Sequence, residues 1–307
     1  MSEVHIHEVG LRDGLQMERE VVPTERKLLW LRRLMASGVG TIQAGSFVHP
    51  GKVPQMADTD RLFAALSSGP GRPPGVTLSA LVLNEKGLER ALASGVDLIC
   101  AGVSASETHS MKNTGMGIAE ATDRIIGVAR RAVAEGRRVQ LSVQSAFGCG
   151  YEGRVPPARV LAIAGRYLEA GMRNVSLADT AGHATPGQVE DLFGALRALD
   201  GGLELACHFH NTYGMGLANA YAALRAGVTS FESSVAGMGG CPFTKIAGGN
   251  VCTEDLIHMF RRMGMCGAVD IRALIAVAAD VAEFFGREMP GTVYRTGIIG
   301  EPEVTAA

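Results

Sequence analysis

The sequence lacks the features that mark several common classes of protein. None of its six cysteines falls in a C-x-x-C pair or a framework spacing, and a chain of 307 residues needs no disulfide bonds to fold. No apolar stretch reaches membrane-spanning length, and the first residues show no signal-peptide pattern. With a net charge of −2 and no basic block, nucleic acid and membrane surfaces are poor candidates as partners. We therefore expect a cytoplasmic protein with reduced thiols.

What the chain contains indicates an ordered, well-packed fold. Hydrophobic residues make up 47% of the sequence and charged residues 20%, so a sizeable core is available. Forty glycines against twelve prolines are typical of a fold with many tight turns. The most linker-like segment, residues 67–74, also fits an ordinary loop between a helix and a strand. We expect a single catalytic domain.

Apolar, strand-like segments alternate with amphipathic, helix-like segments along the chain. The strand-like segments are residues 4–9, 39–45, 76–82, 97–103, 138–145, 173–178, 203–209 and 228–235. Between them, Leu28, Leu31 and Leu34 recur at helical spacing, and residues 118–136, 157–171 and 186–199 behave alike. Glycines that follow several of these helices fit C-caps before the next strand.

Eight strand–helix repeats predict an α/β fold, a closed (β/α)8 TIM barrel. We expect the barrel over about residues 4–265 and a C-terminal helical extension over about 266–307, with a helix from Ile271 to Phe285. The alternative is an open, doubly wound sheet. Such a sheet would usually carry a glycine-rich phosphate loop after its first strand, and residues 10–14 do not match one.

A His-x-His pair, His208 and His210, stands at the end of an apolar, strand-like run. Residues two apart on a strand point to the same face, roughly 6.6–6.8 Å apart along it, so two such imidazoles can share a metal ion. The alternative is a pair of hydrogen-bonded core histidines. A polar turn follows the pair at residues 211–214, and Arg12 and Asp13 occupy the corresponding place after the first strand, which favours the metal site.

Polar residues follow most of the predicted strands at the end where TIM-barrel enzymes place their chemistry. They are Arg12, Asp13, Gln43, Ser46, Tyr151, Glu152, Asp179, Thr180, His208 and His210, together with the glycine-rich loop 236–250. Polar groups brought together from distant positions are costly to bury without a use. The pattern therefore predicts an active site at the C-terminal end of the barrel.

Seven segments, in order and at family-like spacing, resemble the hydroxymethylglutaryl-CoA lyase family. They are VGLRDGLQ (9–16), SFV (46–48), VPQM (53–56), YEG (151–153), SLADT (176–180), HFHNTYG (208–214) and GGCP (239–242). The resemblance covers about residues 4–285. It implies retro-aldol cleavage of a 3-hydroxy-3-methyl acyl-CoA thioester to acetyl-CoA and a keto acid such as acetoacetate. It also implies a TIM barrel and a divalent cation (Mg²⁺ or Mn²⁺). The expected assembly is a homo-oligomer, namely a dimer.

The resemblance also assigns roles to particular residues. The metal-ligand positions correspond to Asp13, His208, His210 and Asn250. The catalytic positions correspond to Arg12, Tyr151, Asp179 and Cys241, and the substrate-binding positions to Gln16, Gln43, Ser46 and Thr180. In this scheme Arg12 stabilises the enolate and Cys241 transfers a proton. The alternatives are an ion pair of Arg12 with a neighbouring carboxylate and a small packing role for Cys241.

One departure from the family concerns Gln43, where the lyases generally carry glutamate. Glutamine keeps the shape and hydrogen bonding but removes a negative charge near the expected metal. Related substrates, citramalyl-CoA or a longer-branched 3-hydroxy-3-alkylglutaryl-CoA, are therefore candidates as well. Two further alternatives are a Claisen-type condensing enzyme resembling isopropylmalate synthase and a non-catalytic paralogue that binds metal or CoA.

Overall fold

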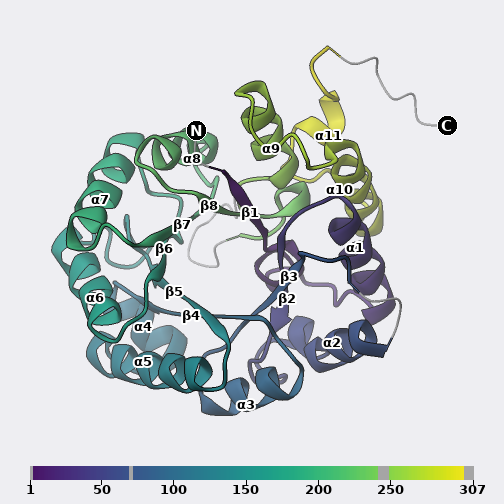
Figure 1. Ribbon diagram of the computed structural model, residues 1–307. Coiled ribbons are helices and arrows are strands. Elements are labelled where there is room, and N and C mark those ends of the chain that lie inside the picture. The colour runs from purple at the N-terminus through teal and green to yellow at the C-terminus, as the bar shows by residue number, and fades with distance from the viewer. Residues whose placement is uncertain (1–2, 69–71, 241–248, 301–307) are drawn as a thin grey trace.

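Eight parallel strands close into a barrel in the computed structural model, which describes residues 3–68, 72–240 and 249–300 (Figure 1). The strands are β1 (His5–Glu8), β2 (Thr41–Ser46), β3 (Thr77–Leu81), β4 (Leu98–Ser104), β5 (Arg138–Gln144), β6 (Asn174–Asp179), β7 (Glu204–Phe209) and β8 (Ser230–Ser233). Each pairs with the next in sequence, and β8 pairs with β1. The predicted TIM barrel is confirmed, and the open sheet is excluded.

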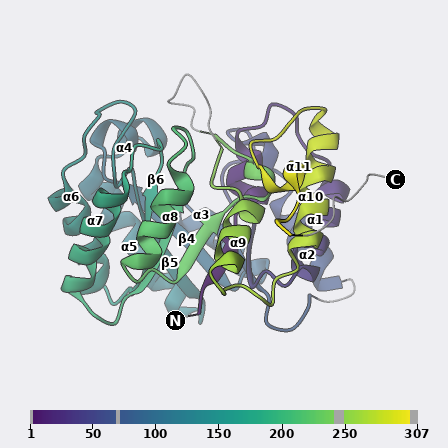
Figure 2. The same ribbon diagram turned by 90° about the horizontal axis from the view of Figure 1, so that it is seen from above.

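Helices surround the barrel in Figure 1, and Figure 2 shows several of them standing in front of the strands. They are α1 (Thr24–Ala36), α2 (Thr59–Ser68), α3 (Glu85–Ala93), α4 (Glu107–Thr114), α5 (Ile118–Ala134), α6 (Pro157–Glu169), α7 (Pro186–Leu199), α8 (Gly216–Arg225) and α9 (Thr253–Arg262). Three short helical turns, η1 (Gly10–Gly14), η2 (Pro54–Met56) and η3 (Val235–Gly237), lie in the loops. Two of these turns, η1 and η3, follow β1 and β8 directly and belong to the loops that build the site.

Local sequence signals explain where individual helices begin. The first turn of α7 carries a capping box, because the Thr185 side chain accepts from the backbone of Gln188 while the Gln188 side chain accepts from the backbone of Thr185. Pro186, which lacks an N–H, occupies the first turn, where that group would have no helical partner. The helix covers Pro186–Leu199, as the sequence predicted.

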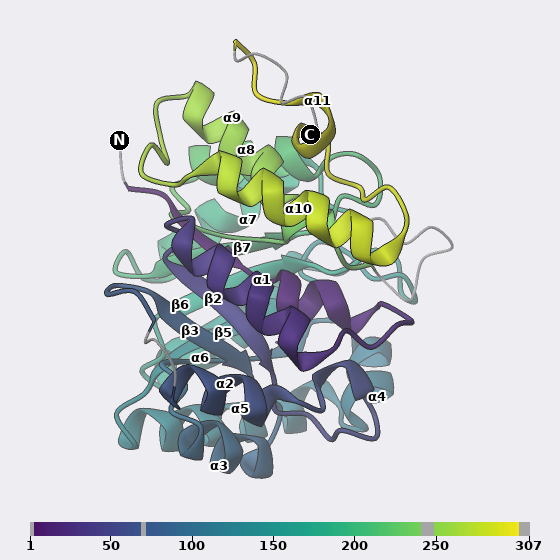
Figure 3. The same cartoon turned by 90° about the vertical axis from the view of Figure 1, so that its right-hand side faces the viewer.

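The C-terminal extension packs against α1. Its helices are α10 (Ile271–Phe285) and α11 (Val293–Thr296), and Figure 3 shows α10 lying along α1. The fully buried Trp30 of α1 meets Phe284 edge-on, with ring centroids 5.6 Å apart, and its indole N–H donates to Asp280 at 2.8 Å. The predicted helix from Ile271 to Phe285 is confirmed. No helix in the described part of the chain is long and apolar enough to cross a membrane.

The barrel interior contains polar pairs as well as apolar side chains. His7 on β1 contacts Ser79 on β3, with 2.7 Å between Nε2 and Oγ. Gly102 on β4 permits close strand packing, because a Cβ there would lie 2.0 Å from Ser142 Oγ.

Candidate metal centre and active site

Three metal-ligating side chains converge at the C-terminal end of the barrel. His208 lies on β7, His210 follows it, and Asp13 lies in η1. His208 Nε2 and His210 Nε2 are 3.1 Å apart, and Asp13 Oδ2 lies 3.7 and 3.6 Å from them. The three side chains offer ligand atoms that all lie within 4.8 Å of one another. One ion can therefore contact all three, as the sequence pattern predicted.

The hydrogen bonds around these side chains fit a divalent cation. Glu232 Oε2 lies 3.0 Å from His208 Nδ1, which places the proton on Nδ1 and leaves the Nε2 lone pair facing Asp13. Asn250 Nδ2 donates to Asp13 Oδ2 and to the carbonyl of Met238, both at 3.0 Å. The buried Asn250 Oδ1 has no hydrogen-bond partner in the described chain. A buried amide oxygen without a partner, on a side chain that contacts Asp13, suits a metal ligand.

The charges of the cluster also favour a cation. Burial opposes ionisation of Asp13, but Arg12 and the two histidines outweigh it and hold the Asp13 pKa well below its usual range. Burial likewise opposes ionisation of Glu232, yet its contact with His208 lowers the Glu232 pKa. The pKa of His208 is raised, because Glu232 and Asp13 together outweigh the effect of burial. Two ionised carboxylates therefore flank the imidazoles.

Arg12 is held in place on two sides. Its Nε donates to Gln43 Oε1 on β2, and its Nη1 donates to Asp13 Oδ1. The structure thus contains the ion pair that the alternative interpretation of Arg12 requires. The same guanidinium also lines the cavity of the site, where a permanent cation can face an anionic group.

A cavity of about 480 Å³ adjoins the cluster. Its lining includes most of the predicted site residues: Arg12, Asp13, Gln16, Gln43, Thr180, His208 and His210. The cavity extends into the barrel past Cys100, Gln140 and Ser142. A volume of this size suits a small-molecule ligand.

Four of the predicted site residues that the structure describes do not line this cavity: Ser46, Asp179, Tyr151 and Asn250. Ser46 Oγ donates to the Leu81 carbonyl at 3.3 Å. Asp179 is fully buried and accepts from the backbone N–H groups of His183 and Ala184, at 2.8 and 3.0 Å. Burial raises its pKa. Ser46 thus contacts the backbone of the neighbouring strand β3, and Asp179 contacts the backbone of the turn that follows β6.

Tyr151 lies in the loop after β5 and is 40% exposed, with Lys112 Nζ 4.6 Å from its ring centroid. It is therefore at the surface and not in the cavity lining. Asn250 is also absent from the lining, but its contact with Asp13 joins it to the cluster. Cys241 lies outside the described residues.

The sequence analysis missed two carboxylates that organise the site. Glu232 on β8 holds His208, and it also accepts from Ser176 Oγ at 3.0 Å. Glu8, the last residue of β1, accepts from the backbone N–H groups of Gly10 and Val235 at 2.7 and 2.9 Å. A carboxylate inside a strand-like segment was the available signal in both cases.

Comparisons with known proteins agree with this geometry. A family model described as HMGL-like matches residues 3–281. A hydroxymethylglutaryl-CoA lyase of Bacillus subtilis is 38% identical over 289 residues, which cover 94% of this chain and 95% of the relative. The chain belongs to the HMGL-like family. Membership in this family makes the protein a carbon–carbon lyase.

Two further members of the HMGL-like family extend the comparison. A 3-hydroxy-3-isohexenylglutaryl-CoA/hydroxymethylglutaryl-CoA lyase of Pseudomonas aeruginosa is 38% identical and covers 93% of this chain, which spans 94% of that protein. The structure of an HMG-CoA lyase from Acinetobacter baumannii in complex with coenzyme A and 3-methylmalate superposes with a TM-score of 0.91. It has 32% identity and covers 99% of this chain and 98% of its own. The name of the Pseudomonas protein includes isohexenylglutaryl-CoA besides hydroxymethylglutaryl-CoA, whereas the Acinetobacter protein is named for HMG-CoA alone.

Proposed function

We propose that the protein cleaves 3-hydroxy-3-methylglutaryl-CoA, or a close analogue, to acetyl-CoA and acetoacetate by a retro-aldol reaction. The observation that carries the proposal is the convergence of Asp13, His208 and His210 beside Arg12 in a cavity of ligand size. The hydroxymethylglutaryl-CoA lyases among its relatives support the choice of substrate.

The reaction balances without a further reactant. The C3 hydroxyl loses its proton, the C2–C3 bond breaks, and C3 becomes the ketone of acetoacetate. The bonding electrons pass to the thioester as an enolate, and a proton delivered to C2 completes acetyl-CoA. A divalent cation on the Asp13 cluster would lower the pKa of the hydroxyl and orient it together with a neighbouring carbonyl.

The chain's own residues account for orientation and charge stabilisation. Arg12 is fixed by Gln43 and Asp13, so its cation is already oriented when negative charge develops on the enolate oxygen. Asn250 fixes the position of Asp13, and Glu232 fixes the position of His208. By resemblance we assign the proton transfer at C2 to Cys241, since a thiol of pKa about 8.5 can exchange protons near neutrality.

Substrate cleavage by the purified protein tests the proposal. The protein is incubated with Mg²⁺ or Mn²⁺ and with hydroxymethylglutaryl-CoA, citramalyl-CoA or a longer-branched analogue, and acetyl-CoA and the keto acid are quantified separately. We expect equal amounts of the two products from hydroxymethylglutaryl-CoA. Failure to cleave any thioester would support the non-catalytic alternative. In a second incubation the protein receives acetyl-CoA and a keto acid. Consumption of the acetyl-CoA would support the condensing alternative.

A related substrate is the second candidate, and Gln43 favours it. This neutral side chain lines the cavity and contacts Arg12, at a position where the lyases generally carry glutamate. The loss of one negative charge reduces repulsion of an anionic acyl group. The relative bound to 3-methylmalate indicates that the fold accommodates ligands of that size.

The remaining expectations concern the setting of the reaction. We propose Mg²⁺ or Mn²⁺ as the ion, because an oxygen-containing ligand set accommodates both. We also propose an acyl-CoA thioester as the partner molecule, a dimer as the assembly, the cytoplasm as the location and leucine degradation as the pathway. Metal analysis and sedimentation of the purified protein test the ion and the assembly.

A further inference from the structure

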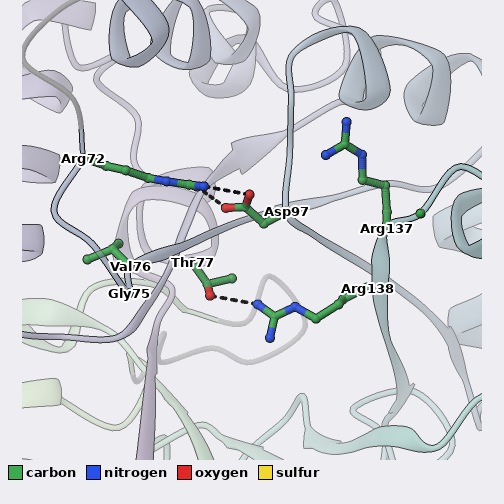
Figure 4. A pocket seen from close by; sticks show the side chains of 8 residues that line it. Arg72, Gly75, Val76, Thr77, Asp97, Arg137 and Arg138 are labelled. Carbon is green, nitrogen blue, oxygen red and sulfur yellow. Dashed lines mark hydrogen bonds and ion pairs between the residues drawn. The ribbon is translucent and has the colours of Figure 1, made fainter.

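A second cavity, of about 420 Å³, lies at the opposite end of the barrel, where β3, β4 and β5 begin (Figure 4). Thr77 and Arg138 are the first residues of β3 and β5, and Asp97 directly precedes β4. Three arginines, Arg72, Arg137 and Arg138, line this cavity together with one carboxylate, Asp97. We call it the basic cavity.

Only one of these arginines has its charge compensated. Arg72 forms a two-pronged ion pair with Asp97, and Asp97 Oδ2 also accepts from the backbone N–H of Leu78 at 2.8 Å. Figure 4 shows Arg72 paired with Asp97, Arg138 extending toward Thr77, and Arg137 extending away from the other labelled side chains. Asp97 is therefore fully used by Arg72 and by the start of β3.

The other two arginines form no ion pair with any described residue. Arg138 Nη2 donates to Thr77 Oγ1 at 2.8 Å, and its other N–H groups have no protein partner in the described ranges. Arg137 Nε is buried and likewise has no hydrogen-bond partner there. Three guanidinium groups and one carboxylate leave the lining with two positive charges.

The buried Arg137 Nε, which has no partner in the described chain, is unfavourable unless an anion or water satisfies it, and the exposed Arg138 adds a second positive charge beside it. Planar guanidinium groups match the oxygens of phosphate in paired hydrogen bonds. A phosphate monoester carries a charge of about −1.5 to −2 at neutral pH, which matches the excess charge of the lining. The cavity volume leaves room for an organic group beyond the phosphate.

We propose that the basic cavity binds a small phosphomonoester, at a site separate from the metal centre. The lining comes from the starts of the strands, whereas TIM barrels place their chemistry at the opposite ends. The ligand is therefore bound in addition to the acyl-CoA and is not the lyase's substrate. The Thr77 hydroxyl, whose oxygen accepts from Arg138, remains able to donate to a phosphate oxygen.

Titration with glycerol 3-phosphate tests the proposal, with glycerol as the uncharged control probe. We expect calorimetry to detect saturable binding to the full-length protein that weakens as salt is added. The double variant Arg137→Gln/Arg138→Gln should bind on the order of tenfold more weakly or worse, because charge-assisted hydrogen bonds are lost. The matched control, Arg32→Gln/Arg225→Gln, removes two exposed arginines that form no ion pair in the described chain, and it should bind like the wild type.

Backbone amide shifts in the wild-type protein provide a readout that does not depend on how the variants fold. Glycerol 3-phosphate should shift the amides of Gly75, Thr77 and Gly136, which border the basic cavity. Unchanged affinity in the double variant would overturn the proposal. So would an absence of binding at low ionic strength, or amide shifts confined to the metal-centre end of the barrel.

Discussion

His210 is buried, yet its Nδ1 has no hydrogen-bond partner in the described chain, while its Nε2 faces His208 and Asp13. We predict that His210→Ala sharply reduces occupancy by Mn²⁺ or Mg²⁺, as measured by metal analysis and calorimetry. Because a ligating imidazole must be neutral, metal affinity of the wild type should also fall as the pH drops through the raised pKa of His208. The control is His49→Ala, which removes a histidine from the cavity lining but not from the cluster. Equal metal occupancy in wild type and His210→Ala would contradict the assignment.

Gln43 contributes a neutral oxygen to Arg12 at a position beside the metal cluster. We predict that Gln43→Glu tightens metal binding, because it adds a negative charge there, and shifts preference toward hydroxymethylglutaryl-CoA. The measurement is kcat/KM for three thioesters in both proteins, since specificity is a ratio of these values. Gln43→Leu, which removes the contact with Arg12 without adding charge, separates the two effects. If Gln43→Glu leaves the metal affinity unchanged, together with the ratios of kcat/KM among the three thioesters, glutamine at this position is a neutral replacement.

Cys241 carries a functional assignment that rests on the GGCP segment at residues 239–242. We predict that Cys241→Ser lowers kcat on the order of 10²–10⁴-fold and changes KM much less, because a hydroxyl exchanges protons poorly near neutrality. Alkylation of the thiol should inactivate the protein, and substrate should protect it. Cys266→Ser, which changes a half-buried cysteine near the C-terminal helices, is the control. Full activity of Cys241→Ser would leave this cysteine a packing role.

At the scale of elements, one carboxylate joins three segments of the site. Glu8 ends β1, and its Oε1 accepts from Gly10 at the start of η1 and from Val235 at the start of η3. Its Oε2 accepts from the hydroxyl of Thr253, the first residue of α9. The turn that carries Arg12 and Asp13 is thereby tied to the loop that leads to Asn250.

We predict that Glu8→Ala lowers metal affinity and the free energy of unfolding together. The variant leaves two buried N–H donors without a partner, at a cost of about 1–3 kcal/mol each. Glu8→Gln keeps one acceptor oxygen and should recover part of both losses. Calorimetric metal titration and thermal melts of the two variants provide the measurements, with exposed Glu25→Ala as the control. Unchanged metal affinity in a folded Glu8→Ala variant would mean that Glu8 supports the fold alone.

The elements themselves were largely predictable, because strand-like apolar runs and helix caps are local signals. Each of the eight expected strands overlaps an observed one. The first and last residues of the helix Pro186–Leu199 were both predicted from the sequence. The direction of individual side chains was not predictable. Ser46 and Asp179 end their strands as expected, but Ser46 bonds to a carbonyl of the neighbouring strand β3, and Asp179 accepts from the turn that follows β6. The β2–β3 register also shifts between Gln43 and Gly45, which no spacing rule indicates.

At the scale of the whole molecule, convergence at one end of the barrel follows from topology. Parallel strands bring residues far apart in sequence to a common edge, so Asp13 and His210 were expected to meet. Pairing inside the barrel needs the closed structure. The hydrogen bond between Glu232 and His208 joins β8 to β7, and no sequence spacing indicates that it forms. The basic cavity escaped notice for the same reason, since its arginines come from two separate segments, one before β3 and one at the start of β5.

Global stability should depend on pH through two buried carboxyl groups. Burial raises the pKa of Glu8 to about 7 and that of Glu254 to about 8, against a usual value of 4.5. Between about pH 4.5 and 8 the folded protein therefore holds protons on these groups that the unfolded chain has released. Their contribution to the free energy of unfolding must then fall as pH rises through this window.

Glu254→Gln isolates this effect, because glutamine resembles the protonated carboxyl group and keeps an acceptor for the Ala236 N–H, 3.1–3.2 Å from the carboxylate oxygens. Each unit of pKa shift corresponds to about 1.4 kcal/mol, so the variant should gain a few kcal/mol on the wild type between pH 5 and 8. Denaturant unfolding of both proteins across that range measures the difference, which cancels the contributions of all other titrating groups. A stability difference that stays constant with pH would show that Glu254 is ionised in the folded protein. The Ala236 N–H would then be donating to a carboxylate, and the turn η3 would be held by a charge-assisted bond in place of a neutral one.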